Sequence, residues 1–161
     1  MKPEETIDFP IRWAWHRIAR LYNAEASKYG GSMALGYVLL NVDFDLGTPS
    51  TKLGPKMGME PRSLTRTLKS MEEKGLIYRE PGKKDKRLVK IFLTDYGKEM
   101  REITKTSVIH LNKVVQAKIG KKNLDAFFDT MSEINSILET EEINHSIYHL
   151  FPSFNGFISN I

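Results

Sequence analysis

The stretch that decides the fold is residues 61–97, PRSLTRTLKSMEEKGLIYREPGKKDKRLVKIFLTDYG. Its first part predicts a helix from Pro61 to Gly75, because proline suits a first turn and glycine a C-terminal end. Its apolar residues recur at helical spacing: Leu64, Leu68 and Met71. The segments LIYRE and LVKIFLT alternate and are rich in β-branched and aromatic residues, which is typical of strands. With PGKKDKR between them, they predict a β-hairpin with a basic tip.

A second, shorter helix is expected just before this stretch. The segment TPSTKLGPKMG offers Thr48 as an N-cap and Pro49 at the first helical position. Gly58 then provides a tight turn into the helix that follows. A short helix, a tight turn and a four-turn helix form a helix-turn-helix.

Two more helices are expected ahead of it. The first has Asp8 as its cap, ends at Gly30-Gly31, and carries an apolar stripe that we expect to be buried: Ile11, Ala14, Trp15, Ile18, Leu21, Tyr22, Ala26 and Tyr29. The second, more fully apolar, follows Ser32 and stops at Gly47.

Further helices are expected downstream. Thr94 is positioned to cap a long helix that runs to Gly120, with Gly97 allowing close backbone packing. This helix exceeds what a small domain needs to cover its core, which suggests a strut or a dimer helix. An amphipathic helix over about 123–138 follows. After Glu142 the tail has one apolar helical face, which we expect to dock either onto the same subunit or into a dimer interface: Ile143, Ile147, Leu150 and Phe151.

The composition and the charge distribution of the chain limit the classes of function that it can have. The chain has 161 residues and no cysteine, which excludes disulfides, cysteine nucleophiles and thiolate metal sites. Its net charge is +4, but residues 50–90 hold 12 basic and 5 acidic side chains, so that segment is +7 and the rest is −3. This asymmetry indicates a polyanion-binding module in a near-neutral scaffold.

The hydropathy of the chain and its first residues indicate in which cellular compartment the protein is expected. Charged residues interrupt every apolar run before the roughly 18 residues that a membrane span needs. The first residues, MKPEETIDFP, are acidic where a signal peptide would be basic and then apolar. We therefore expect a cytoplasmic protein without a membrane partner.

In this order of elements, the chain resembles the MarR family of bacterial transcriptional regulators. In the hairpin, Asp85-x-Arg87, five residues and Leu93-Thr94-x-x-Gly97 reproduce the family's D-x-R-x5-L-T-x2-G pattern. The segment LTRTLKSMEEKGLIYR is similar to the family's recognition helix running into its first wing strand. The resemblance covers about residues 8–138.

The resemblance implies a mainly α fold with a small β-hairpin wing, a winged helix-turn-helix domain flanked by dimerisation helices. Residues 1–32 would form an N-terminal dimerisation helix, 33–97 the DNA-binding domain, and 98–161 the C-terminal dimerisation helices and apolar tail. We expect a homodimer that binds an inverted-repeat operator in double-stranded DNA, as a repressor released by a small-molecule effector.

The chemistry of DNA reading selects candidate residues. A helix in the major groove reads base edges with side chains of its N-terminal turns, and the candidates are Arg62, Ser63, Thr65, Arg66 and Lys69. Arg62 and Arg66 lie four apart on one face, and either could donate two hydrogen bonds to a guanine. Ser63 and Thr65 are more suited to phosphates or neighbouring bases. For Lys69, phosphate contact and a merely solvated position are equally good interpretations.

The wing tip supplies a second set of candidates. Lys83, Lys84 and Lys86 are placed to contact the DNA backbone or the minor groove. By resemblance, Arg87 is the residue placed in the minor groove, and Asp85 positions the wing by pairing with a nearby base.

The resemblance also implies an effector pocket between the dimerisation helices and the winged domain. The candidate lining residues are Trp13, Trp15, His16, Tyr22, Tyr37 and His110. Aromatic residues at helical spacing are also typical of an ordinary core, which is the alternative interpretation of this set.

The sequence gives less support to other classes of function, namely an enzyme or a protein-interaction module. No set of nucleophile, base and metal ligands converges in the sequence, so we expect no enzyme, no cofactor and no metal site. His145 and His149 are spaced i, i+4, but no further ligands accompany them. The remaining alternative is a winged-helix protein-interaction module without specific DNA binding, against which the basic wing tip argues.

Overall fold

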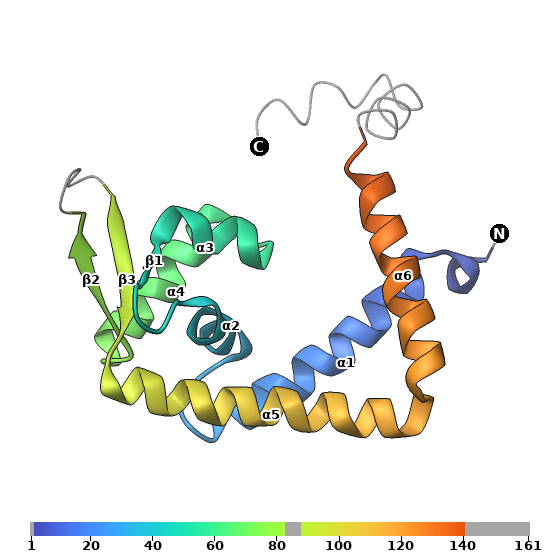
Figure 1. The fold of residues 1–161 in the computed structure, drawn as a ribbon, viewed down its shortest axis with the longest axis horizontal. Coiled ribbons are helices and arrows are strands. Elements are labelled where there is room, and N and C mark those ends of the chain that lie inside the picture. The colour runs from blue at the N-terminus through green and yellow to red at the C-terminus, as the bar shows by residue number, and fades with distance from the viewer. Residues whose placement is uncertain (1, 83–87, 141–161) are drawn as a thin grey trace. The chain divides into compact units, whose positions relative to one another are not determined.

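The computed structural model describes residues 2–82 and 88–140, drawn in colour in Figure 1. The chain divides into two units, residues 1–111 and 112–161, which are described separately. Several expectations lie outside the described residues: the wing-tip roles of Lys83, Lys84, Asp85, Lys86 and Arg87, the histidines His145 and His149, and the apolar tail after Glu142.

The first unit is built around helix α4 (Pro61–Glu73). As expected, Pro61 opens the helix, and Leu64, Leu68 and Met71 form its buried face. Gly75 follows with a φ of +68°, a left-handed conformation that glycine adopts without strain. The apolar period therefore placed this helix correctly.

The hairpin that follows is also confirmed. Strands β2 (Ile77–Pro81) and β3 (Val89–Leu93) pair antiparallel, with Ile77 opposite Leu93 and Arg79 opposite Ile91. Ile77, Ile91 and Leu93 are buried against α4 and its neighbours in one core cluster. A two-residue strand, β1 (Thr48–Pro49), adds to the other edge of β3, so that the strand order is β1-β3-β2.

Helix α3 (Ser50–Met57) begins later than expected. Thr48 is not its N-cap, and Pro49 is not its first helical residue, because both belong to β1 and Thr48 pairs with Ile91 of β3. The turn into α4 does form at Gly58, whose φ is +58°. A Cβ on Gly54 would lie 3.1 Å from the Met59 carbonyl oxygen, so a glycine lets this turn close tightly.

Helix α2 (Met33–Asn41) is shorter than expected. The Ser32 hydroxyl caps it by accepting the Leu35 N–H, but the helix ends at Asn41 rather than at Gly47. The Asp43 carboxylate accepts the N–H groups of Leu46 and Asp45 at 2.8 and 3.0 Å, which forms a local turn in place of further helix. These bonds lower the pKa of the Asp43 carboxyl below its ordinary range.

Helix α1 (Asp8–Ser27) follows a short 3-10 helix, η1 (Pro3–Glu5). Its N-cap is Ile7, so Asp8 lies inside the first turn and is not the cap. The expected burial of its apolar stripe is wrong for the single chain: within the described residues none of α1 is buried. Trp15, for example, remains 47% exposed, although its ring stacks on Tyr37 of α2.

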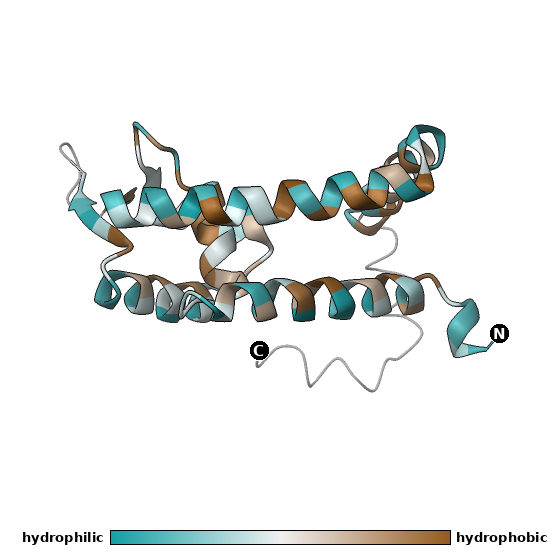
Figure 2. Cartoon of the chain, turned by 90° about the horizontal axis from the view of Figure 1, so that it is seen from below, coloured by the Kyte–Doolittle hydropathy of each residue, from teal (hydrophilic) through white to brown (hydrophobic). Residues whose placement is uncertain are grey.

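Helix α5 (Asp95–Ile119) is the expected long helix. The Thr94 hydroxyl accepts the Gly97 N–H at 2.9 Å and donates to the Gly75 carbonyl oxygen at 2.6 Å. A Cβ on Gly97 would overlap the Leu76 carbonyl oxygen, which confirms the expected close packing. Figure 2 shows polar and apolar residues alternating along both α1 and α5.

The second unit contains the end of α5 and helix α6 (Lys121–Leu138), which begins two residues earlier than expected. None of its described residues is buried, and Phe127 and Phe128 are 53% and 59% exposed. Within residues 2–82 and 88–140, no helix combines the length and apolar character needed to cross a membrane. The same residues hold no cluster of three acidic or histidine side chains that could bind a metal ion.

Candidate nucleic-acid interface and adjoining cavity

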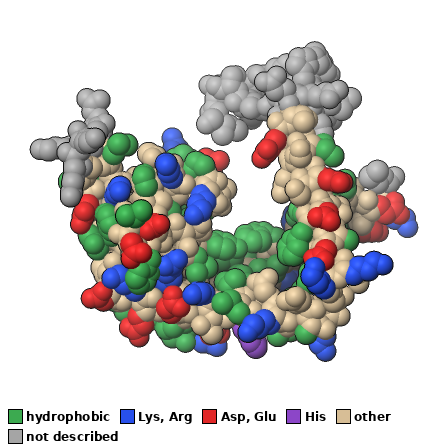
Figure 3. Space-filling view, in the orientation of Figure 1, with side chains coloured by type: hydrophobic (Ala, Val, Ile, Leu, Met, Phe, Trp, Pro, Cys, Tyr) green, Lys and Arg blue, Asp and Glu red, His purple; other side chains and the backbone are tan. Residues whose placement is uncertain are grey.

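Helix α4 presents a polar face to solvent. Its buried apolar face fixes the opposite side outward, and all five candidate side chains on it are exposed: Arg62, Ser63, Thr65, Arg66 and Lys69. The structure therefore brings the helical part of the predicted set together on one surface. Figure 3 shows Lys and Arg side chains on the surface of this unit.

The exposed polar groups on α4 differ in what they offer a ligand. The Thr65 hydroxyl donates to the Pro61 carbonyl oxygen at 2.9 Å, so in this conformation it presents only acceptor lone pairs. Lys69 lies 3.9 Å from Glu73, a long and exposed ion pair that leaves its ammonium well hydrated. Each arginine can offer a planar fork of donors, the geometry that matches the edge of a guanine.

The C-terminal half of α4 is tied to the wing. Glu72 accepts from Arg79 of β2 at 3.0 Å. Beyond the helix, the Thr94 N–H donates to the Leu76 carbonyl oxygen at 3.1 Å. The first contact joins α4 to β2, and the second joins the residue before β2 to the residue after β3.

Two further exposed cations lie near the candidate DNA-binding residues, and the sequence analysis did not include them. Lys52 and Lys56 lie four residues apart on α3, the first helix of the helix-turn-helix, and both are exposed. Because an i, i+4 spacing places two side chains on one helical face, their spacing was the signal available in the sequence.

A cavity of about 250 Å³ lies within the first unit, among the C-terminal end of α1, helix α2 and helix α5. Its wall includes Tyr22 and Tyr29 from the first of these, Met33 and Tyr37 from the second, and Met100 from the third. Lys74, the residue that follows α4, also lines it, so the cavity touches the end of the helix that carries the candidate DNA-reading residues.

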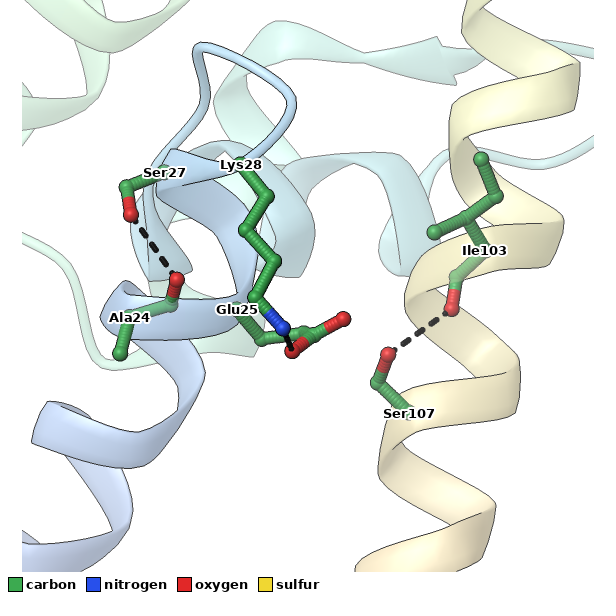
Figure 4. A network of polar contacts seen from close by, with 6 residues as sticks. All are labelled: Ala24, Glu25, Ser27, Lys28, Ile103 and Ser107. Atoms are coloured by element: carbon green, nitrogen blue, oxygen red, sulfur yellow. Dashed lines mark hydrogen bonds and ion pairs between the residues drawn. The ribbon is translucent and has the colours of Figure 1, made fainter.

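The charged groups at this cavity are already paired. Figure 4 shows Glu25 on α1 extending toward α5 while its carboxylate accepts from Lys28 at 2.6 Å. This hydrogen bond raises the pKa of the Lys28 ammonium. The Lys74 ammonium donates to the Gly30 carbonyl oxygen at 3.0 Å.

Two of the tyrosines in the cavity wall have shifted pKa values. Burial raises the pKa of Tyr22, and the neighbouring Tyr37 adds to the effect. Burial likewise raises the pKa of Tyr37. Both hydroxyls therefore keep their protons at neutral pH and can act as hydrogen-bond donors.

The cavity includes only part of the lining set expected from the sequence. Tyr22 and Tyr37 belong to its wall. Trp13, Trp15, His16 and His110 are all exposed, and they lie outside its wall. The sequence also missed Tyr29, Tyr96 and Met100, because helical spacing alone does not say which face of a helix meets its neighbour.

The comparisons with known proteins address this fold. Residues 46–89, which run from the turn before β1 to the start of β3, match the family model described as MarR family. Over these residues the chain is similar to the MarR family. The comparison with curated protein sequences gave no match.

Solved structures share the fold of this winged helix and its flanking helices. The transcriptional regulator SlyA has a TM-score of 0.75 at 20% identity, over 82% of this chain and 93% of that one. The Staphylococcus aureus MepR–DNA complex has a TM-score of 0.76 at 16% identity, over 81% and 97%. The PcaV regulator from Streptomyces coelicolor, in complex with its natural ligand, has 0.75 at 17%, over 86% and 98%. The fold expected from the sequence is thus confirmed.

Proposed function

We propose that the chain is a transcriptional regulator that binds double-stranded DNA by placing α4 in the major groove. The observation that carries this proposal is the orientation of α4: its apolar face is buried in the core, and Arg62 and Arg66 stand on the exposed one. Arginines in the first turns of a docked helix reach base edges, and the basic segment around them supplies phosphate contacts. Lys52 and Lys56 on α3 join that second group.

We further propose that the chain acts as a homodimer. In the first unit, α1 leaves Trp13 and Trp15 about half exposed, and in the second unit α6 leaves Phe127 and Phe128 more than half exposed. Large apolar side chains gathered on helices of a soluble protein indicate surfaces that a partner covers. In this division of roles, residues 33–97 bind DNA, while 1–32 and 98–161 dimerise.

The same proposal includes control by a small molecule. The cavity is lined by α1 and by α5 from Met100 onward, both outside residues 33–97, and also by α2 and by Lys74, the residue that follows α4. A ligand that binds this cavity more tightly in one conformation than in another would shift the population toward that conformation. We propose a cytoplasmic repressor whose ligand favours a form unable to hold its operator; PcaV, a protein of similar fold, is a regulator with a ligand bound.

Salt-dependent binding tests the central proposal. Fragments selected from a random duplex pool should share an inverted repeat, and their affinity should fall steeply as salt rises, because bound phosphates release counterions. Equal binding to acidic proteins, or binding to every duplex alike, would contradict specific DNA recognition and would instead favour a protein-interaction module.

A further inference from the structure

A single carboxylate lies within the basic segment that forms the proposed DNA-binding helices. Residues 46–71 include five lysines and arginines, and Glu60 is the only acidic residue among them. Glu60 directly precedes Pro61, the first residue of α4, and its side chain is exposed. DNA phosphates repel a carboxylate, so at this place it weakens DNA binding unless the DNA offers it a hydrogen-bond donor.

The backbone holds Glu60 in a defined position at the leading end of α4. Its φ of −58° and ψ of 140° are extended, because the proline that follows restricts the residue before it. Its carbonyl oxygen accepts the Leu64 N–H at 3.0 Å, which is a first-turn bond of the helix. On its other side, Met59 packs against the core and donates its N–H to the Gly54 carbonyl oxygen at 3.0 Å. The Glu60 side chain therefore extends from a backbone that is anchored on both sides.

The carboxylates on or beside α4 differ in their partners. At the C-terminal end of the helix, Glu72 accepts from Arg79 at 3.0 Å, and Glu73 lies 3.9 Å from Lys69. The Glu60 side chain forms no cap hydrogen bond, and within the part of the chain that the structure describes it forms no ion pair either. Its two oxygens are therefore available to a ligand that approaches the first turn of α4.

The four bases offer a carboxylate different groups in the major groove. A carboxylate can only accept hydrogen bonds. Cytosine presents an N4 amino donor, whereas guanine and thymine present only acceptors, and adenine presents one donor beside an acceptor. Side chains at the N-terminal end of a docked helix contact base edges. A carboxylate at the start of α4 is thus best matched by cytosine and is repelled by guanine and thymine.

We propose that Glu60 is a specificity-determining residue, which accepts a hydrogen bond from the N4 amino group of a cytosine in the operator. This inference rests on the proposed reading of DNA by α4. Arg62 and Arg66 favour guanine because they donate, whereas Glu60 favours cytosine because it accepts. The start of α4 thereby reads each half-site with groups of both signs, and Glu60 rejects guanine and thymine at its own position.

Base preference, measured on the full-length protein, tests this role. Dissociation constants are determined for the duplex selected from the random pool and for each of its single-base-pair variants. At one position of each half-site, wild type should bind cytosine about tenfold more tightly than guanine or thymine. Glu60→Ala should reduce this ratio to less than about threefold. It should not weaken binding to unrelated duplexes, because it removes a negative charge near the phosphates.

Two further variants complete the test. Glu60→Gln replaces the carboxylate by an amide, which matches the N6 and N7 groups of adenine, so the preference at the same position should move toward adenine. Glu73→Ala removes a carboxylate from the other end of α4 and is the matched control, because it should leave every base preference unchanged. Thermal unfolding of all three variants should match wild type, since both glutamates are exposed.

The outcomes separate this inference from the proposed function. If wild type discriminates among duplexes but Glu60→Ala has the same base preferences, or loses affinity equally for all duplexes, the role of Glu60 is wrong and the regulator stands. A wild type that discriminates among duplexes without favouring cytosine at any position of the half-site also overturns that role alone. Equal binding of wild type to every duplex would overturn both proposals.

Discussion

Arg66 and Thr65 are neighbours on α4, yet they offer a DNA base different groups. The Thr65 hydroxyl donates to the Pro61 carbonyl oxygen and would have to rotate before it could donate to a phosphate. Arg66 is exposed, and its guanidinium carries five N–H donors in a fixed fork. The structure therefore makes the arginine the stronger candidate for base recognition and leaves the threonine a secondary one.

Alanine at Arg66 should remove a base contact, whereas alanine at Lys84 should remove a phosphate contact. Arg66→Ala should cost about 1 to 3 kcal/mol of binding free energy and relax the preference at one position of each half-site. Lys84→Ala, a wing position assigned from the sequence alone, should weaken all duplexes alike and reduce the salt slope by about one. Quantitative binding to a library of operator variants at several salt concentrations measures both effects.

Lys105→Ala is the matched control, since it removes a cation from α5 that pairs with Glu102 outside the helix-turn-helix. It should leave sequence preference unchanged. If Arg66→Ala left that preference intact, the register assigned to α4 on DNA would be wrong.

Asp43 makes the stability of the protein depend on acid. Its two backbone hydrogen bonds lower the folded-state pKa below the ordinary value of 3.8, so its contribution is fully present above that pH and is lost as pH falls through the lowered pKa. Asp43→Asn should therefore lower the free energy of unfolding at pH 6, and the difference from wild type should shrink as the pH falls below the ordinary value of 3.8. Denaturant unfolding across this range measures it. Asp45→Asn removes the same charge two residues away and is the control. An equal loss of unfolding free energy with the same pH dependence in this variant would contradict the role of the Asp43 hydrogen bonds.

At the scale of elements, the junction of α4, β2 and α5 depends on close backbone contact. Gly97 lies in the first turn of α5 directly against the Leu76 carbonyl oxygen, and Gly75 ends the turn after α4. The junction joins the proposed DNA-reading helix to the long helix, so a change in its geometry should affect both.

Gly97→Ala should destabilise the folded protein, because the new methyl group would overlap a carbonyl oxygen that cannot move without shifting the backbone. The expected loss is about 1 to 3 kcal/mol, typical of added volume at a packed site. Thermal and denaturant unfolding measure it. Glu99→Ala, at an exposed position of the same helix, should stay within about 0.5 kcal/mol of wild type. A Gly97→Ala variant as stable as wild type would mean that the close contact is not required.

Local patterns predicted some elements well and failed at others for physical reasons. The apolar period and the flanking Pro61 and Gly75 located α4, and the Thr94 hydroxyl located the start of α5. The local pattern predicts a helix at Thr48, but Thr48 pairs with Ile91 in the sheet. This pairing joins residues far apart in sequence, so no local pattern can predict it. The early end of α2 depends on a side-chain turn at Asp43, which the apolar pattern of the helix does not indicate.

Of the two candidate sites, the local sequence pattern predicts the DNA-binding face of α4 but not the cavity. The exposed face of α4 followed from its period, because burial of one face determines the other. The cavity did not follow, because its wall depends on how three helices approach one another. Tyr22 and Tyr37 face it, whereas Trp15 stacks on Tyr37 from outside the wall.

At the scale of the whole molecule, apolar surface remains uncovered on each unit considered by itself. Within the described chain, neither α1 nor α6 has a buried residue, although both carry large apolar side chains. The buried core belongs instead to α2, α3, α4 and the sheet. Because the buried core is confined to the winged helix, we expect α1 and α6 to be stabilised by contact with a second copy of the chain.

The full chain should therefore be a stable dimer at micromolar concentration, with twice the monomer mass by light scattering. Its recognition helices should meet half-sites about 34 to 36 Å apart, so footprinting should show an inverted repeat with one helical turn between centres. Phe127→Ser with Phe128→Ser should shift the mass toward monomer and weaken operator binding, because two exposed rings of the proposed interface are lost. Asp129→Ser, on the same helix, should do neither. A single asymmetric half-site bound by monomer would contradict the arrangement.

Thr94 restricts which amino acids its position can accept. One hydroxyl there receives the Gly97 N–H and gives its own hydrogen to the Gly75 carbonyl oxygen, so the position requires a donor and an acceptor on the same atom. Valine has the same shape and provides neither, while asparagine and aspartate are longer and place their polar atoms elsewhere. In a library with all twenty residues at position 94, selected for operator binding, serine should be the substitution that survives. The tolerance of this position would then be set by hydrogen-bond chemistry rather than by side-chain volume.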